Sequence, residues 1–202
     1  VLRTERPRHF SVNKIDPSGK KARSHRPEKP EATTVRVSVG APGGGDAPRV
    51  TALAAALADA GFDCQVSQRV QQDIWYKLWG NMTMNPVSAF TGATVDRILD
   101  DELANGFCQA VMREARAIGA AIGCPIEQTV EARNAITRKL GAFKTSMLQD
   151  VEAGKAVELD ALVTVVRDLG QLTGVATRCL AGSCIESMTR STSSKLRPVV
   201  IG

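Results

Sequence analysis

The chain has 202 residues, which is enough for one ordinary domain or for one domain with part of a second. With 43% hydrophobic and 23% charged residues its composition is globular, and its longest apolar runs fall far short of the roughly 18 residues that a membrane span needs. The net charge of +5 comes from residues 1–30, where nine Lys and Arg stand against three Asp and Glu. We therefore predict a soluble, cytoplasmic protein without a secretory signal, whose folded body is close to neutral.

Residues 1–33 contain four prolines and almost no aliphatic periodicity, so we expect a basic, disordered arm. Such an arm can bind nucleic acid or another anionic surface through counterion release, but Phe10 is its only aromatic residue. We therefore favour a solvated arm over a nucleic-acid partner. The arm holds both histidines of the chain, His9 and His25, which disfavours a histidine-based triad or metal site.

The cysteines are widely spaced and form neither a C-x-x-C pair nor a Cys–His cluster that would hold zinc. This pattern favours a reduced, intracellular setting without a bound metal. We expect Cys64 and Cys108 to be apolar fillers of the core. The full set is Cys64, Cys108, Cys124, Cys179 and Cys184.

Residues 34–68 predict a strand, a helix and a second strand. β-branched and polar residues alternate over 34–40, an alanine-rich helix follows from Pro48 to about Ala60, and the alternation returns over 62–67. This order invites comparison with a complete nucleotide-binding domain, in which a glycine-rich loop joins the first strand to the helix.

The glycine-rich loop does not match the dinucleotide-binding fingerprint. That fingerprint is G-x-G-x-x-G, whereas Gly43 and Gly45 are followed at the position of the third glycine by Pro48. No acidic ribose ligand is evident at the end of a following strand. We therefore interpret residues 34–68 as a βαβ-like remnant.

Residues 69–178 read as a helical domain, and residues 179–202 as a polar tail. The helix that starts near Asp100 or Asp101 has apolar residues at spacings of three and four, from Leu103 to Ile122. Ser146 and Gln149 match a capping box, with Ser146 as the helix cap. The predicted helices cover about 71–84, 101–122, 127–140, 147–153 and 158–172.

The segment 75–86 holds both tryptophans and places Lys77, Asn81 and Asn85 at i, i+4 and i+8. At about 100° per residue these three polar side chains follow one helical stripe. A cation and two amides among Trp, Leu and Met indicate a half-buried polar cleft. Three other readings stay open: Asn85 ends the helix because it precedes Pro86, Asn81 is an ordinary exposed residue, and Lys77 extends past the tryptophans.

Three segments together resemble the C-terminal domain of the ketopantoate reductases (2-dehydropantoate 2-reductases). The polar stripe and its proline match the family's K-x-x-x-N-x-x-x-N-P helix. Residues 146–150 match its S-M-x-Q-D segment, and Glu158 supplies the acidic residue twelve positions beyond the serine. The pieces occur in order and at the right intervals, and the resemblance covers about residues 35–177.

The resemblance implies a fold in which an N-terminal Rossmann domain binds NADPH. A helical bundle of the 6-phosphogluconate-dehydrogenase C-terminal type would bind the substrate and form a homodimer. It also implies NADPH-dependent reduction of the keto acid ketopantoate to pantoate in pantothenate biosynthesis. This chain would supply the half with the substrate site and the catalytic lysine.

The resemblance further implies a role for each site residue. Lys77 would be the general acid, and Asn81 and Asn85 would orient the substrate. Ser146 would contact the carboxylate or hydroxyl end of the substrate, and Glu158 would pair with the substrate or with Lys77. The residues alone leave alternatives, because Ser146 suits a helix cap and Glu158 suits the first turn of a helix, where it complements the helix dipole.

The chain departs from the family at both ends. Residues 34–68 correspond to only the end of a Rossmann-like domain, and neither 1–33 nor 179–202 fits the family pattern. The cofactor-binding residues are therefore unknown. We predict a mainly α protein that is either half of a reductase or a non-catalytic helical module for dimerisation or small-acid binding.

Overall fold

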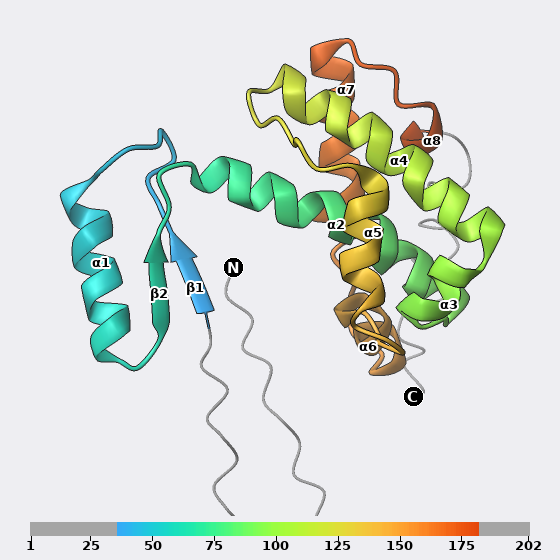
Figure 1. Cartoon of the computed structure of the whole chain (residues 1–202), viewed down its shortest axis with the longest axis horizontal. Coiled ribbons are helices and arrows are strands. Elements are labelled where there is room, and N and C mark those ends of the chain that lie inside the picture. The colour runs from blue at the N-terminus through green and yellow to red at the C-terminus, as the bar shows by residue number, and fades with distance from the viewer. Residues whose placement is uncertain (1–35, 182–202) are drawn as a thin grey trace, which may run out of the picture. The chain divides into compact units, whose positions relative to one another are not determined.

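The computed structural model describes residues 36–181, which divide between Val70 and Gln71 into two compact units (Figure 1). The described part is mainly helical with one short two-stranded sheet, as the sequence predicts. The predicted basic arm (1–33) and residues 182–202 of the predicted polar tail lie outside the described residues.

The first unit is a strand–helix–strand element made of β1 (Arg36–Val39), α1 (Pro48–Asp59) and β2 (Asp63–Val66). Pro48 takes a first-turn position of α1, where its missing N–H would have no helical partner. Gly61, with a φ of +87°, lies in the turn from α1 into β2. The two strands pair in parallel, which confirms the predicted βαβ-like remnant.

The end of β1 lies against the segment that follows β2. A Cβ at Gly40 would lie 2.6 Å from the carbonyl oxygen of Ser67 and 2.7 Å from Cβ of Val70. Only glycine allows the backbone to approach this closely. Few apolar side chains of this unit are buried: within residues 36–70 they are Val37, Ala41 and Val50.

The second unit starts along α2 (Val70–Thr91), which is longer than predicted. The prediction that Pro86 ends the helix is wrong, because α2 continues through it to Gly92, where φ is +70°. Proline removes one backbone hydrogen bond and disfavours the α conformation of the residue before it. Here, burial of Met84 and Val87 in a core cluster offsets that cost.

A short helix that the sequence analysis missed, α3 (Val95–Asp100), precedes the long α4 (Glu102–Ala121). The side chain of Asp101 caps α4 by accepting the N–H of Ala104 at 2.8 Å, as its position in the sequence suggested. One predicted core position is wrong: Leu103 is 85% exposed. It lies on the first turn of α4, where spacing alone does not provide a neighbouring element to bury it.

The remaining helices are α5 (Val130–Arg138), α6 (Ser146–Glu152), the π-helical turn η1 (Asp160–Thr164), α7 (Val165–Thr173) and α8 (Arg178–Ala181). The π turn and α7 are continuous and together form the predicted last helix. Helix α8 lies at the start of the predicted polar tail, so helical structure extends beyond its predicted limit.

Helix α8 is fixed to α4 by one carboxylate. Oε1 of Glu114 accepts the N–H of Cys179 at 2.8 Å, and Oε2 accepts the N–H of Leu180 at 3.0 Å. These are N–H groups of a first helical turn, which have no partner within the helix. The side chain of Leu180 is fully buried in the larger core cluster.

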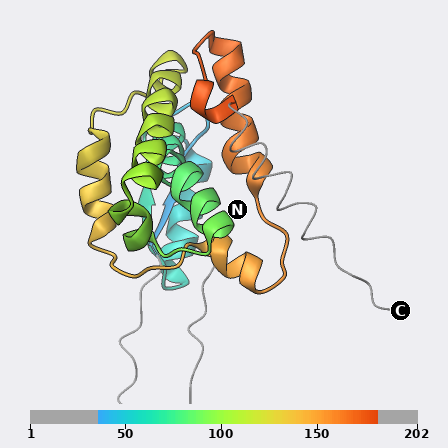
Figure 2. The ribbon, with the colours of Figure 1, turned by 90° about the vertical axis from the view of Figure 1, so that its right-hand side faces the viewer.

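Two hydrophobic clusters hold the second unit together. The larger cluster combines Trp75 and Trp79 of α2 with side chains of α4, η1, α7 and α8. The smaller one joins the end of α2 to α3 and the start of α4, with Cys108 at its centre. Figure 2 shows α4 and α7 as neighbouring helices. Across residues 36–181, no helix has both the length and the apolar character of a membrane span.

Candidate active site

Helix α2 has one face fixed in the core. Trp79 is fully buried, and its Nε1 donates to the carbonyl oxygen of Met112 at 2.7 Å. The indole of Trp75 lies on α4 at Gly119, where an added Cβ would be 2.1 Å from Nε1. At about 100° per residue, the stripe of Lys77, Asn81 and Asn85 lies on the side opposite the tryptophans.

A second set of contacts fixes the neighbouring side of α2. Nε2 of Gln72 donates to the carbonyl oxygen of Pro125 at 2.9 Å, and the hydroxyl of Tyr76 donates to Oε1 of Gln128 at 2.6 Å. The guanidinium of Arg133 lies 4.8 Å from the ring centroid of Tyr76 and also packs against Gly80. These contacts help to set the rotation of α2 about its axis.

Exposure falls steadily along the polar stripe. Lys77 is exposed, Asn81 is half-buried and Asn85 is only 8% exposed. Asn85 is helical and lies six residues before Thr91, the last residue of α2, so it does not end the helix. Within residues 36–181, none of the three side chains forms a hydrogen bond or an ion pair. The stripe therefore combines an exposed cation at one end with a buried, unbonded amide at the other.

Ser146 is not a helix cap, which corrects the capping-box prediction. The cap of α6 is Thr145, whose Oγ1 accepts the N–H of Leu148 at 3.2 Å, and Ser146 is the first residue of the helix. Thr145 and Ser146 both carry a hydroxyl that suits a helix cap. The residue that takes the cap position is the more buried one, Thr145, which is 2% exposed. The half-buried Ser146 hydroxyl has no hydrogen-bond partner in the part of the chain that the structure describes.

Glu158 is exposed and lies just before the last long helix. The helix begins with a π-helical turn (160–164), a feature often found at functional sites and one that the sequence analysis did not predict. In residues 36–181, Glu158 makes no ion pair with Lys77. The residues next to this pair, Leu78 and Leu159, both pack against the larger core cluster.

The segment that leads into α6 is tied to the start of α3. The carbonyl oxygen of Phe143 accepts the N–H of Val95 at 2.9 Å, which ties the segment before α6 to the start of α3. No hydrogen bond joins any two of the five predicted site residues among those described.

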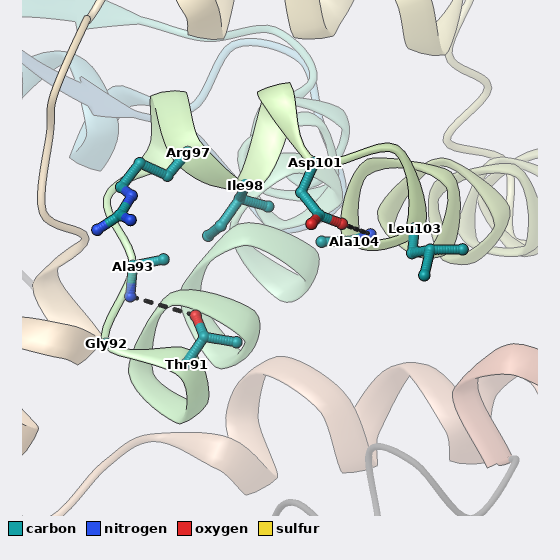
Figure 3. A pocket seen from close by; sticks show the side chains of 8 residues that line it. All are labelled: Thr91, Gly92, Ala93, Arg97, Ile98, Asp101, Leu103 and Ala104. Carbon is teal, nitrogen blue, oxygen red and sulfur yellow. Dashed lines mark hydrogen bonds between the residues drawn. The ribbon is translucent and has the colours of Figure 1, made fainter.

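A cavity of about 590 Å³ lies elsewhere, between the end of α2, α3 and the start of α4 (Figure 3). Two of its polar side chains are engaged locally: Oγ1 of Thr91 accepts the N–H of Ala93, and Asp101 caps α4. None of the predicted site residues lines it. Its lining consists of Thr91, Gly92, Ala93, Arg97, Ile98, Asp101, Leu103 and Ala104.

Two of the described thiols, those of Cys108 and Cys179, are poor nucleophiles because their environment raises their pKa. Burial raises the pKa of Cys108 to about 12, so it stays protonated near neutral pH. Burial, followed by the nearby charge of Glu114, also raises the pKa of Cys179. Cys108 is fully buried, which confirms its role as a core filler, whereas Cys64 is only partly buried.

The described residues do not fit a dinucleotide site. The loop before α1 has Gly44 and Gly45 at positive φ, but its helix starts at Pro48 after a cap residue, Ala47, that makes no side-chain cap bond. The loop thus lacks the third glycine of the fingerprint and the helix start that would receive a pyrophosphate. The sequence interpretation of this loop agrees with its structure.

Comparison with known proteins gives the family. The model of the ketopantoate reductase PanE/ApbA C-terminal domain matches residues 69–182. The chain belongs to the ketopantoate reductase family. A 2-dehydropantoate 2-reductase of Mesorhizobium japonicum is 42% identical over 137 residues, which cover 68% of this chain and 42% of that protein.

Solved structures of ketopantoate reductases have the same fold. One from Ralstonia solanacearum MolK2 is 52% identical with a TM-score of 0.74, over 80% of this chain and 49% of that one. The dimeric ketopantoate reductase of Staphylococcus aureus is 20% identical with a TM-score of 0.65, over 80% and 55%, and shows the fold alone. The chain thus spans about half the length of the relatives that it matches.

Proposed function

We propose that this chain is the substrate-binding and proton-donating half of an NADP-dependent reductase that converts ketopantoate to pantoate. The observation that carries the proposal is the polar stripe of α2. Lys77, Asn81 and Asn85 follow one helical face, directed away from the tryptophan core, and their side chains have no partner within residues 36–181. Unbonded polar groups in a recess suit a ligand that supplies the missing hydrogen bonds.

The proposed chemistry places the proton at Lys77. Reduction of a 2-keto acid builds negative charge on the carbonyl oxygen as a hydride reaches the carbon. The Lys77 ammonium would donate a hydrogen bond to that oxygen, stabilise the developing charge and transfer a proton to give the hydroxyl. A nicotinamide cofactor would supply the hydride in the family's reaction, but the residues described here offer it no site. This chain's own part is therefore recognition and proton transfer.

The two amides would fix the substrate without adding charge. Each amide has two N–H donors and one carbonyl acceptor, which suits an acid that carries carboxylate, keto and hydroxyl groups. Asn85 is the more buried of the pair, so we assign to it the deeper end of the substrate. Ser146 would contact the carboxylate or hydroxyl end, and Glu158 would pair with the substrate or with Lys77 once a ligand is bound.

The alternative is a helical module that keeps the fold and binds a small acid or a second copy without catalysis. An exposed Lys77 beside two unpaired amides suits a bound acid in both cases, so the two functions differ only in whether proton transfer follows binding. A homodimeric, cytoplasmic enzyme is the corresponding proposal for assembly and location.

The test is a titration of the full chain with ketopantoate, in which calorimetry measures binding. An assay of keto-acid-dependent NADPH oxidation follows. We expect saturable binding that Lys77→Ala and Asn85→Ala each weaken by about tenfold or more. Lys139→Ala is the matched control, since Lys139 is also exposed and lies at the C-terminal end of α5. Binding without NADPH oxidation is the result expected of the substrate half by itself, and oxidation that Lys77→Ala abolishes would establish catalysis by this chain. Equal binding by wild type and Lys77→Ala would refute the assignment of Lys77.

A further inference from the structure

The entry to α6 is held by several bonds within residues 144–152. The hydroxyl of Thr145 accepts the N–H of Leu148 at 3.2 Å, and Nε2 of Gln149 donates to the carbonyl oxygen of Lys144 at 3.0 Å. Nζ of Lys144 donates to Oε1 of Glu152 at 2.7 Å. Each of these polar side chains is thus used within the segment itself.

Ser146 is the exception in this segment. It is half-buried, it follows the cap directly, and its hydroxyl has no partner among the described residues. If Ser146 were itself the cap, its hydroxyl would be bonded to a backbone N–H of the first turn and would not be free for a ligand. The position of the cap therefore decides whether this hydroxyl is available.

We propose that Thr145 is a positioning residue for the substrate: by capping α6 from a buried site, it keeps the Ser146 hydroxyl unbonded and directed to the 2-keto acid. This inference deepens the proposed function and rests on it. Thr145 touches no substrate, because it is 2% exposed and its oxygen is already occupied by Leu148. It acts by competing successfully for the backbone N–H that Ser146 would otherwise bind.

The experiment compares Thr145→Val, which keeps the shape and removes the acceptor, with Thr145→Ser, which restores it. We expect Thr145→Val to weaken ketopantoate binding by about five- to tenfold, as Ser146→Ala does, and Thr145→Ser to bind like wild type. In a Ser146→Ala background, Thr145→Val should have no further effect on affinity, because the group that it positions is gone.

Thr129→Val is the matched control for helix capping. Oγ1 of Thr129 accepts the N–H of Ala132 at 3.1 Å and caps α5 in the same way. Losing this cap should lower the stability of the chain as Thr145→Val does, but it should leave keto-acid affinity unchanged. A merely structural role for Thr145 would instead make the two valine variants alike in affinity.

A second readout keeps this inference separate from the proposed function. In NMR spectra of the full chain without ligand, the Hα–Hβ couplings of Ser146 report its side-chain rotamer, and Thr145→Val should change them while Thr129→Val should not. Unchanged couplings together with unchanged affinity would overturn the role of Thr145. If wild type binds no ketopantoate, the proposed function fails, and the couplings alone support or refute the control of Ser146 by Thr145.

Discussion

The two units of the chain differ in how many buried apolar side chains stabilise them. The first has a two-stranded parallel sheet, one helix and only Val37, Ala41 and Val50 as buried apolar residues within 36–70. The second has two hydrophobic clusters and a fully buried tryptophan. Two parallel strands rarely persist without further covering elements, whereas a helical unit with a continuous core can fold by itself. We therefore expect the stability of the described chain to reside in the second unit.

The largest expected effect is the loss of the central tryptophan. Trp79→Ala should lower the free energy of unfolding by about 3–5 kcal/mol, because it empties a fully buried site. Urea unfolding followed by circular dichroism measures this change. Leu172→Ala is the control, since Leu172 is 83% exposed and should change stability by less than about 0.5 kcal/mol. Similar effects of the two variants would contradict the assigned core.

Overpacking of the same core should have the next largest effect. Gly119→Ala places a Cβ 2.1 Å from Nε1 of Trp75 and should destabilise the unit by about 1–3 kcal/mol in the same urea experiment. Gly106→Ala lies on the same helix with nothing within 4 Å of its Cβ. The control should be neutral or slightly stabilising, because alanine favours the helix. A stable Gly119→Ala variant would mean that Trp75 is not fixed against α4.

The buried thiol of Cys108 predicts a loss of stability at alkaline pH. Burial raises its pKa from the ordinary value of 9.0 to about 12, so above pH 9 the thiol ionises in the unfolded chain while the folded chain holds its proton. The stabilisation is complete below pH 9 and is lost as pH rises toward 12. Between about pH 9 and 10.5 the free energy of unfolding should fall by about 1.5 kcal/mol more in wild type than in Cys108→Ala. Parallel pH profiles would show that Cys108 is not buried.

The smallest expected effect on the second unit comes from a change in the first. Gly40→Ala places a Cβ 2.6 Å from the carbonyl oxygen of Ser67, so the backbone between β1 and β2 must shift. Amide hydrogen exchange should accelerate in β1 and β2, and the urea midpoint of the helical unit should stay the same. A matching loss of stability in α4 would show that the two units unfold together. It would contradict the expectation that the second unit is stable by itself.

The sequence predicted those features that depend on local pattern. The spacing of Lys77, Asn81 and Asn85 placed them on one face, and Asp101 was identified as a start of the long helix. Prediction from the sequence failed where two residues suit the same position equally well and packing decides which of them takes it. Thr145 and Ser146 are adjacent and both suit a cap, and only burial distinguishes them.

Pro86 and Leu103 show the same limit of prediction from local sequence. Pro86 has a strong local tendency to end a helix, but the surrounding core keeps α2 continuous through it. Leu103 follows the apolar spacing of its helix, yet no described element covers it. The π-helical turn and α3 were missed because the first has no sequence signal and the second is too short to show a period.

The close contact of Trp75 with Gly119 has a consequence for the evolution of this helix. The contact and the Trp79 anchor fix the rotation of α2, so the exposed end of the opposite face, at Lys77, carries few folding constraints. The exposed end of the stripe can then change identity without loss of the fold. A single scaffold could thereby acquire preference for a different keto acid through a few substitutions, and libraries restricted to this face are the natural route to altered selectivity.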